Sequence, residues 1–190
     1  MASLITSPLL KTYTLEEFWK LPEPKDGAKL ELIAGVLFLT PQPECPHDNI
    51  VSRSLQKLSA YLSQRDDKGK LYVPRAAIWT GTHTYLEPDM FYVSAELEAT
   101  MKPEHRHTAD LVIEVISPGS AIYDRNTKAE TYGALGINEL WLIDETGQTV
   151  EALYKRGKGF GKKSTFKKGQ RIASKIFPDL KLAVDELFKD

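Results

Sequence analysis

Two short segments that are apolar on both faces place the strongest constraint on the fold of this 190-residue chain. Residues 110–116 contain the run LVIEVI, and residues 139–144 read ELWLID. Strands of this kind lie in the middle of a sheet that is covered on both sides. Between them, residues 122–135 have helical periodicity and end before Gly136, a typical C′ glycine. The sequence therefore predicts an α/β sandwich with a mixed central sheet.

The segments outside this centre are predicted from their periodicity and turn residues. Helices are expected at residues 12–22, 48–63 and 183–188. Strands are expected at residues 71–79 and 85–93, N-terminal β segments at 29–40 with a turn near Ala34-Gly35, and a C-terminal hairpin joining 149–154 to 162–166. Three prolines, Pro41, Pro43 and Pro46, are expected to break the chain before the second helix. The order of the central elements is thus helix, three strands, helix, strand.

The composition restricts the class of protein. Hydrophobic residues make up 42% and charged residues 27%, which excludes a disordered chain and a membrane protein. No apolar run approaches the roughly 18 residues that a membrane-spanning helix needs, and the N-terminus lacks the pattern of a secretory signal. The single cysteine, Cys45, can form neither an internal disulfide nor a cysteine-based zinc site. We therefore expect one domain over residues 1–190, cytoplasmic and not bound to a membrane.

The charge is distributed unevenly, although the net charge is only −1. Residues 155–175 hold nine Lys and Arg and no acidic residue, and the rest of the chain has a balance of −10. A basic stretch on an acidic body is typical of a surface that binds phosphates, but a solvated lysine-rich hairpin gives the same pattern. The candidate contacts to a DNA backbone are Lys162, Lys163, Lys167 and Lys168.

Glu114 is the most informative single residue, because it lies in the middle of the apolar run DLVIEVISP. Burying a carboxylate that is ionised and unpaired costs several kcal/mol. A metal ion, a cationic partner or a raised pKa must offset this cost. A surface-facing glutamate near the end of a strand is the alternative. Strand alternation places Glu114 on the same face as Val112 and Ile116.

Two further residues complete a chemically sensible set. Asp89 follows Pro88 at the start of an apolar strand, where a turn aspartate is also common. Lys128 shares a helical stripe with Tyr132 and points inward if that stripe faces the sheet, but an outward ion pair with Asp124 fits the periodicity equally well.

Together these three residues are able to perform phosphodiester chemistry. Two carboxylates suit Mg²⁺, with Mn²⁺ as an alternative, and leave room for water and phosphate. A bound metal ion activates water, and a nearby ammonium group offsets charge in the transition state. Glu31 and His47 are candidates for an outer ligand or a proton shuttle, although a structural role is common for such residues.

The segments LELIAGVLFLTPQPECPHDNIV, EPDMFYV and ADLVIEVISPGSAIYDRNTKAETYGALGINELWLID resemble the Uma-two family of endonucleases, in the PD-(D/E)XK nuclease superfamily. The resemblance covers residues 12–188. It implies a restriction-endonuclease-like fold with an αβββαβ core, in which Asp89 and Glu114 are the two acidic residues of the motif. The usual lysine position, two residues after the acid, holds Ile116, so the matching lysine is Lys128 in the following helix. The resemblance also highlights a set of auxiliary residues: Glu31, His47, Ser117, Asp124 and Tyr132.

Three functions are compatible with this sequence. The first is a Mg²⁺-dependent DNA endonuclease in which Asp89 and Glu114 bind the metal ion and Lys128 assists the attacking water. The second is a catalytically inactive nuclease-fold module that binds DNA or a protein partner. The third is a glycosidase using the two carboxylates as acid and base, which gives Lys128 no role. The apolar segment GVLFLT is able to pair with a second copy, so a homodimer is one expected assembly.

Overall fold

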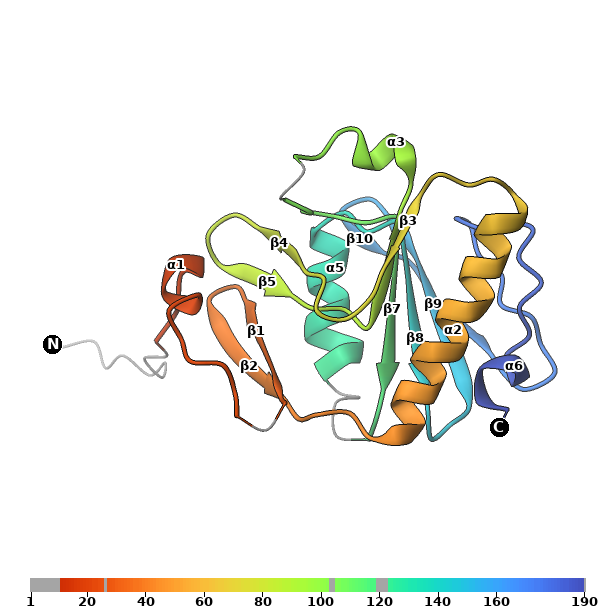
Figure 1. Cartoon of the computed structure of the whole chain (residues 1–190), viewed down its shortest axis with the longest axis horizontal. Coiled ribbons are helices and arrows are strands. Elements are labelled where there is room, and N and C mark those ends of the chain that lie inside the picture. The colour runs from red at the N-terminus through yellow and green to blue at the C-terminus, as the bar shows by residue number, and fades with distance from the viewer. Residues whose placement is uncertain (1–10, 26, 103–104, 119–122, 190) are drawn as a thin grey trace, which may run out of the picture.

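The computed structural model describes residues 11–25, 27–102, 105–118 and 123–189. Its larger sheet has the strand order β10-β9-β8-β7-β6-β3, with β11 also paired to β9 (Figure 1). Strands β7 and β8 are parallel and the other neighbours are antiparallel, so the expected mixed central sheet is confirmed. The strands of this sheet are β3 (Lys70–Tyr72), β6 (Met90–Val93), β7 (Leu111–Ile116), β8 (Glu139–Asp144), β9 (Thr149–Arg156), β10 (Gly159–Phe160) and β11 (Ser164–Phe166).

A smaller, four-stranded sheet lies beside the large one and has the order β2-β1-β5-β4. Its strands are β1 (Lys29–Ile33), β2 (Val36–Thr40), β4 (Ile78–Thr80) and β5 (Thr84–Leu86). The β1–β2 hairpin turns at Ala34 and Gly35, as expected, and both have left-handed backbone angles, with φ of 49° and 83°. Two such residues in a two-residue loop match the twist of the flanking strands. This arrangement leaves β2 at the edge of the small sheet.

Two of the predicted strands are wrong as continuous elements, because each contributes to both sheets. The segment 71–79 leaves the large sheet at a turn around Pro74 and then enters the small sheet as β4. The segment 85–93 begins in the small sheet as β5 and resumes in the large sheet as β6 after Pro88. Proline lacks the N–H group that a strand ladder needs, so each proline marks the point where pairing changes.

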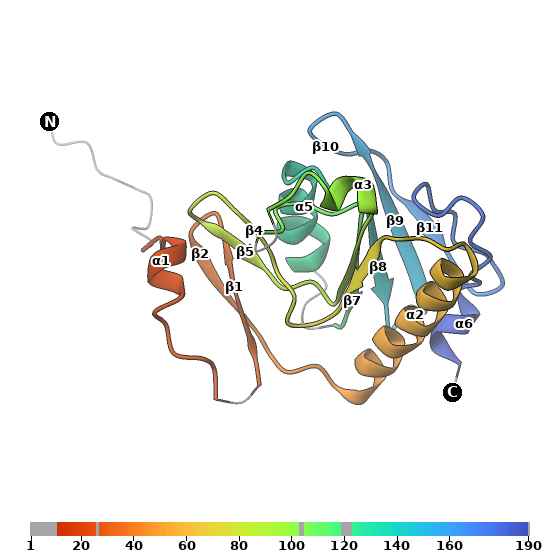
Figure 2. The same cartoon turned by 45° about the horizontal axis from the view of Figure 1, so that its top comes forward.

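Helices cover the two faces of the large sheet (Figures 1 and 2). Helix α2 (Cys45–Gln64) packs on the face that carries Ile113 and Trp141, and α6 (Asp185–Phe188) lies against α2. Helix α5 (Ala129–Ala134) packs on the other face through Tyr132. Strand alternation therefore produces two cores, one on each side of the sheet. The described residues also form two short helices, α1 (Leu15–Phe18) and α3 (Ala95–Glu98).

Three helix starts differ from those expected: α1 begins at Leu15 instead of residue 12, α6 at Asp185 instead of residue 183, and α2 at Cys45 instead of residue 48. Helix α2 begins three residues earlier than predicted, since Pro46 occupies its first turn, where the missing N–H group costs no hydrogen bond. The helix after β7 begins in the described residues with a π-helical turn, η1 (Asp124–Lys128), and continues as α5; its expected first residue, Ile122, lies outside the described residues. Gly136 follows α5 with φ of 82°, as a C′ glycine does. Within the described segments, no helix is long and apolar enough to cross a membrane.

Candidate active site

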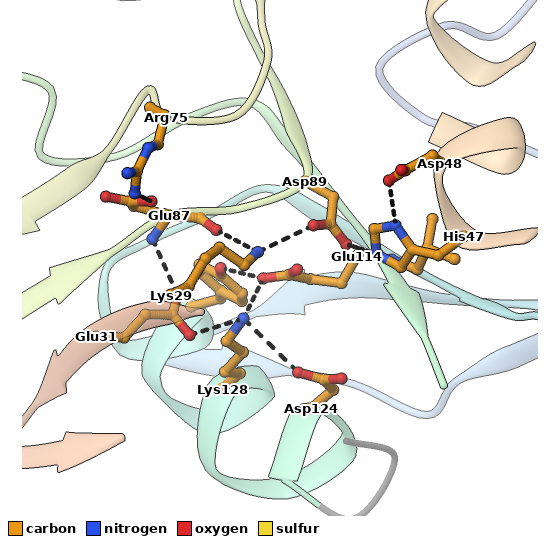
Figure 3. Close-up of polar contacts among 12 residues, drawn as sticks. Lys29, Glu31, His47, Asp48, Arg75, Glu87, Asp89, Glu114, Asp124 and Lys128 are labelled. Carbon is orange, nitrogen blue, oxygen red and sulfur yellow. Dashed lines mark hydrogen bonds and ion pairs between the residues drawn. The ribbon is translucent and has the colours of Figure 1, made fainter. Parts of the chain in front are cut away.

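Asp89, immediately before β6, and Glu114, on the neighbouring strand β7, lie on the same face of the large sheet. Strand β6 pairs with β7 so that Met90 lies opposite Ile113. Continuing this antiparallel register by one residue brings Asp89, immediately before β6, opposite Glu114 in the middle of β7. Both residues are buried, with 3% and 2% of their surface exposed. The two acidic residues therefore approach each other from adjacent strands, as Figure 3 shows.

Both carboxylates line a cavity of about 710 Å³. One side of the cavity is formed by the end of β2 and the segment that leads into α2. The end of β7, η1 and the turn after β8 also line it. A concave site of this size, with converging polar groups, is typical of a ligand or substrate site.

Asp89 is held by three partners. Lys29 donates to Oδ1 at 3.0 Å, the backbone N–H of Val115 donates to Oδ2 at 2.9 Å, and Nε2 of His47 lies 3.0 Å from Oδ2. Burial alone would raise the pKa of Asp89, but the hydrogen bond from His47 and the charge of Lys29 outweigh it and lower the pKa. Asp89 is thus an ionised carboxylate over the physiological range.

Glu114 has a different electrostatic environment. Lys128 donates to its Oε1 at 2.9 Å, and the Tyr132 hydroxyl donates to the same oxygen at 2.5 Å, so neither occupies Oε2. Burial raises the pKa of Glu114 to about 7; the charge of Lys128 opposes this rise, and the neighbouring charge of Asp89 adds to it. A cation placed between the two carboxylates would favour the ionised form of Glu114.

Lys128 points inward and is surrounded by carboxylates. Its Nζ atom lies 2.9 Å from Glu114, 3.1 Å from Glu31 and 3.7 Å from Asp124 (Figure 3). Burial favours the neutral amine, but the three carboxylates outweigh it and raise the pKa of Lys128 well above the usual range. Lys128 therefore remains protonated and acts as a hydrogen-bond donor.

The small sheet contributes Lys29 and Glu31 to the site. These residues are two apart on β1, so both side chains point to the same face. Glu31 is fully buried, and its Oε1 accepts a hydrogen bond at 2.9 Å from the backbone N–H of Glu87, between β5 and β6. Lys29 also donates to the Glu87 carbonyl oxygen at 3.2 Å. The site therefore lies where the two sheets meet.

The structure brings most of the predicted residues together. Glu31, His47, Asp124 and Tyr132 each contact Asp89, Glu114 or Lys128, and Ser117 lines the cavity. The lysines predicted to contact a DNA backbone (Lys162, Lys163, Lys167 and Lys168) are exposed and are not among the lining residues. Lys163 instead pairs with Glu151 at 3.0 Å.

Lys29 was missed by the sequence reasoning. The available signal was the alternation in KLELI, which places Lys29 on the same face as Glu31. Once Glu31 is considered as a buried site residue, Lys29 becomes a candidate as well.

The donor set suits a hard divalent cation. Mg²⁺ is commonly bound by one or two carboxylates, with water and substrate phosphates completing its shell. Asp89 and Glu114 provide these two carboxylates at one cavity wall. No cluster of three or more His, Cys, Asp or Glu side chains within the described part of the chain is arranged to hold a metal ion. A metal ion at this pair would therefore keep several positions for water and phosphate.

Comparison with known proteins identifies the family. One solved structure, a protein of Anabaena variabilis described as a "putative nuclease belonging to DUF820", has the same fold, with a TM-score of 0.75. The two sequences are 21% identical, and the match covers 92% of this chain and 97% of that one. No curated protein matches the chain significantly. The profile of the Uma2 family, described as "Putative restriction endonuclease", matches residues 15–185, nearly the whole length. The chain therefore belongs to the Uma2 family of restriction-endonuclease-like nucleases.

Proposed function

We propose that this chain is a divalent-metal-dependent DNA endonuclease that hydrolyses phosphodiester bonds in the cavity lined by Asp89 and Glu114. One observation carries the proposal: Asp89 and Glu114 lie side by side on one face, with the Lys128 ammonium group bonded to Glu114. Family membership supports nuclease chemistry. We propose Mg²⁺ as the cofactor, with Mn²⁺ as the alternative, because both carboxylates supply hard oxygen donors.

Asp89 and Glu114 are the residues proposed to hold the metal ion. A divalent ion bound there would lower the pKa of a water ligand and polarise the scissile phosphate. The contacts of Lys29, His47 and the Val115 N–H group fix the orientation of the Asp89 carboxylate. Tyr132 and Lys128 do the same for Glu114. This support keeps the ligand oxygens in place before substrate arrives.

Lys128 is proposed to assist the attacking water as a hydrogen-bond donor. Its raised pKa keeps the ammonium group protonated, so it does not act as a base. A fixed positive charge beside the reacting phosphate stabilises the extra negative charge of the transition state. His47 contacts Asp89 at the cavity wall and is a candidate for moving a proton to or from the site.

The exposed lysines Lys162, Lys163, Lys167 and Lys168 are proposed to contact the DNA backbone outside the cavity. Contacts of this type raise affinity without reading sequence. The edge strand β2 is proposed as the pairing surface for a homodimer, because its backbone is free on one side within the described sheet.

The proposal is tested by a cleavage assay. Labelled DNA is incubated with the purified protein and Mg²⁺ or Mn²⁺, with and without a chelator, and the products are separated by size. We expect cleavage that requires the metal ion and is lost in Glu114→Gln and Asp89→Asn. Absence of cleavage with either ion, or cleavage that persists in both variants, would contradict the proposal.

The matched control is Asp110→Asn. Asp110 is also a carboxylate next to β7, but at the other end of the strand, where it accepts hydrogen bonds from the backbone N–H of Ser94 and from Asn138. It does not line the cavity. This variant is expected to retain cleavage, which separates loss of chemistry from a general effect of removing a carboxylate.

A further inference from the structure

The cavity has an apolar wall next to the acidic pair, and the nuclease chemistry proposed above gives this wall no role. This wall is the set of lining residues Phe38, Pro41, Pro43 and Tyr123, and it lies next to the acidic pair because Nζ of Lys128, which is bonded to Glu114, is 5.6 Å from the centre of the Tyr123 ring. Resting on the proposed function, we infer that the substrate enters as an unpaired strand, with a base near the scissile phosphate packed against this wall. The site would then favour single-stranded or locally unpaired nucleic acid over a continuous duplex.

The wall includes an aromatic pair. The rings of Phe38, on β2, and Tyr123, just before η1, are stacked with centroids 4.5 Å apart and an angle of 23° between their planes. Phe38 lies opposite Glu31 in the β1–β2 register, so it faces the same side as the buried glutamate. Aromatic side chains beside a phosphate site are a common platform for unpaired bases, because every base has an apolar face.

The depth of the site favours an unpaired nucleotide. Asp89 and Glu114 are almost completely buried at the cavity wall, so a phosphate reaches them only by entering the concavity with its neighbouring groups. The cavity volume of 710 Å³ lies within the range of about 300–1,000 Å³ that is typical of pockets for small ligands. An unpaired nucleotide is able to turn its base into such a space. A base-paired nucleotide first has to leave its stack, which costs a few kcal/mol.

The charges of the lining lead to the same inference. Five carboxylates line the cavity, whereas its two lysines, Lys29 and Lys128, are both bonded to carboxylates. The carboxylates are Glu44, Asp89, Glu114, Asp124 and Glu145. Duplex binding draws much of its affinity from many Lys and Arg contacts to phosphates. The cavity lining does not offer such contacts to phosphates. The favourable contact that it does offer is the packing of a base against the apolar wall.

The first experiment compares cleavage of three labelled substrates of one sequence: a single strand, a fully paired duplex and a duplex with an unpaired internal segment. We expect the single strand and the unpaired segment to be cut at least about 10-fold faster than the duplex, which corresponds to one base-stacking contact. A duplex that is cut as fast as the single strand would overturn the inference but leave the proposed nuclease function intact.

The second experiment removes the wall. Phe38→Ala is expected to slow cleavage of the single strand by about 10-fold and to change duplex cleavage much less. The control is Trp19→Ala, which removes another aromatic ring, one that is 56% exposed and does not line the cavity. Phe38→Leu is used if the alanine variant does not fold, because leucine preserves the apolar volume but cannot stack. Equal effects on both substrates, or none, would overturn the inference.

The third experiment measures binding without cleavage. The Glu114→Gln protein is titrated, with fluorescence anisotropy as the readout, into a labelled single strand, a duplex and an abasic strand of equal length. We expect the single strand to bind more tightly than both others, since the abasic strand keeps the phosphates but lacks bases. Equal affinity for the intact and abasic strands would overturn the inference. If no substrate is cleaved, the proposed function fails, and this binding comparison still decides the inference.

Discussion

Lys29 and Asp89 form a contact of 3.0 Å although sixty positions of sequence separate them. Lys29 belongs to the small sheet, and Asp89 immediately precedes a strand of the large sheet. The side chain of Lys29 is 14% exposed, while that of Lys128 is only 3% exposed. The two lysines therefore divide the acidic pair between them: Lys29 neutralises Asp89, and Lys128 neutralises Glu114.

Replacing Lys29 by methionine tests this division. Methionine preserves much of the apolar stem but removes the charge, so the pKa of Asp89 should rise toward its ordinary value. We expect the free energy of unfolding at neutral pH to fall by about 1–3 kcal/mol. The measurement is urea denaturation with a chelator present. Because the pKa of Asp89 is lowered in the folded protein, the difference from wild type should shrink as the pH falls through that lowered pKa.

The control for Lys29→Met is Lys20→Met. Lys20 also pairs with an acid, Glu16, at 2.6 Å, but both side chains are largely exposed. Exposed pairs contribute little because water and salt screen them. A difference from wild type as large in Lys20→Met as in Lys29→Met would contradict the assigned role of Lys29.

Replacing Lys128 by methionine should have a larger effect. The change leaves Glu31, Glu114 and Asp124 close together without their shared cation. Breaking a buried ion pair from one side costs about 3–5 kcal/mol. We expect a loss of this size in urea denaturation at neutral pH.

The double variant Lys128→Met with Glu114→Gln supplies the matched comparison for Lys128. It removes one of the unpaired carboxylates, so it should recover part of the loss. Full stability in Lys128→Met alone would mean that the three carboxylates are not neutralised by this lysine. No recovery in the double variant would mean that Glu114 is not the principal partner.

His47 should make the stability of the metal-free protein depend on pH. Burial lowers the pKa of His47, but the hydrogen bond and charge of Asp89 outweigh burial and raise the pKa above the unfolded value. The protonated form is therefore favoured in the folded state. Its stabilising contribution is fully present below about pH 6.5 and is lost as the pH rises through the raised pKa.

The measurement for His47 is the free energy of unfolding of wild type and His47→Gln at several pH values in a chelator. Wild type should exceed the variant most at the acidic end of the range from about pH 6 to 9. A difference that is constant over this range, or that grows with pH, would show that His47 is not a protonated partner of Asp89.

The central fold was predictable from local pattern. The runs LVIEVI and ELWLID correspond to β7 and β8, and the intervening helical period corresponds to η1 and α5. These elements carry strong apolar signals because both faces of the sheet are covered. The division of 85–93 between two sheets was not predictable in the same way, although Pro88 marks the break. Which sheet each half joins is decided by partners far away in the sequence.

The candidate site shows the same limit. Glu114 stands out because a carboxylate interrupts an apolar run, and that signal is local. Periodicity left Lys128 with two orientations; the inward one is observed, because Tyr132 on the same stripe packs against the sheet face that carries Glu114. Alternation in KLELI places Lys29 on the same face as Glu31, but the burial of that face depends on β1 reaching the large sheet.

The junction between the sheets determines how the proposed catalytic site assembles during folding. A molecule whose large sheet has formed while β1 is still detached would possess both acids, yet Lys29 and Glu31 would be missing from their neighbourhood. Asp89 would then lack the charge of Lys29 and keep only the contacts of His47 and the Val115 N–H group, so its carboxylate would be held less firmly. Loosening the N-terminal hairpin alone should therefore abolish the proposed cleavage before the rest of the protein unfolds.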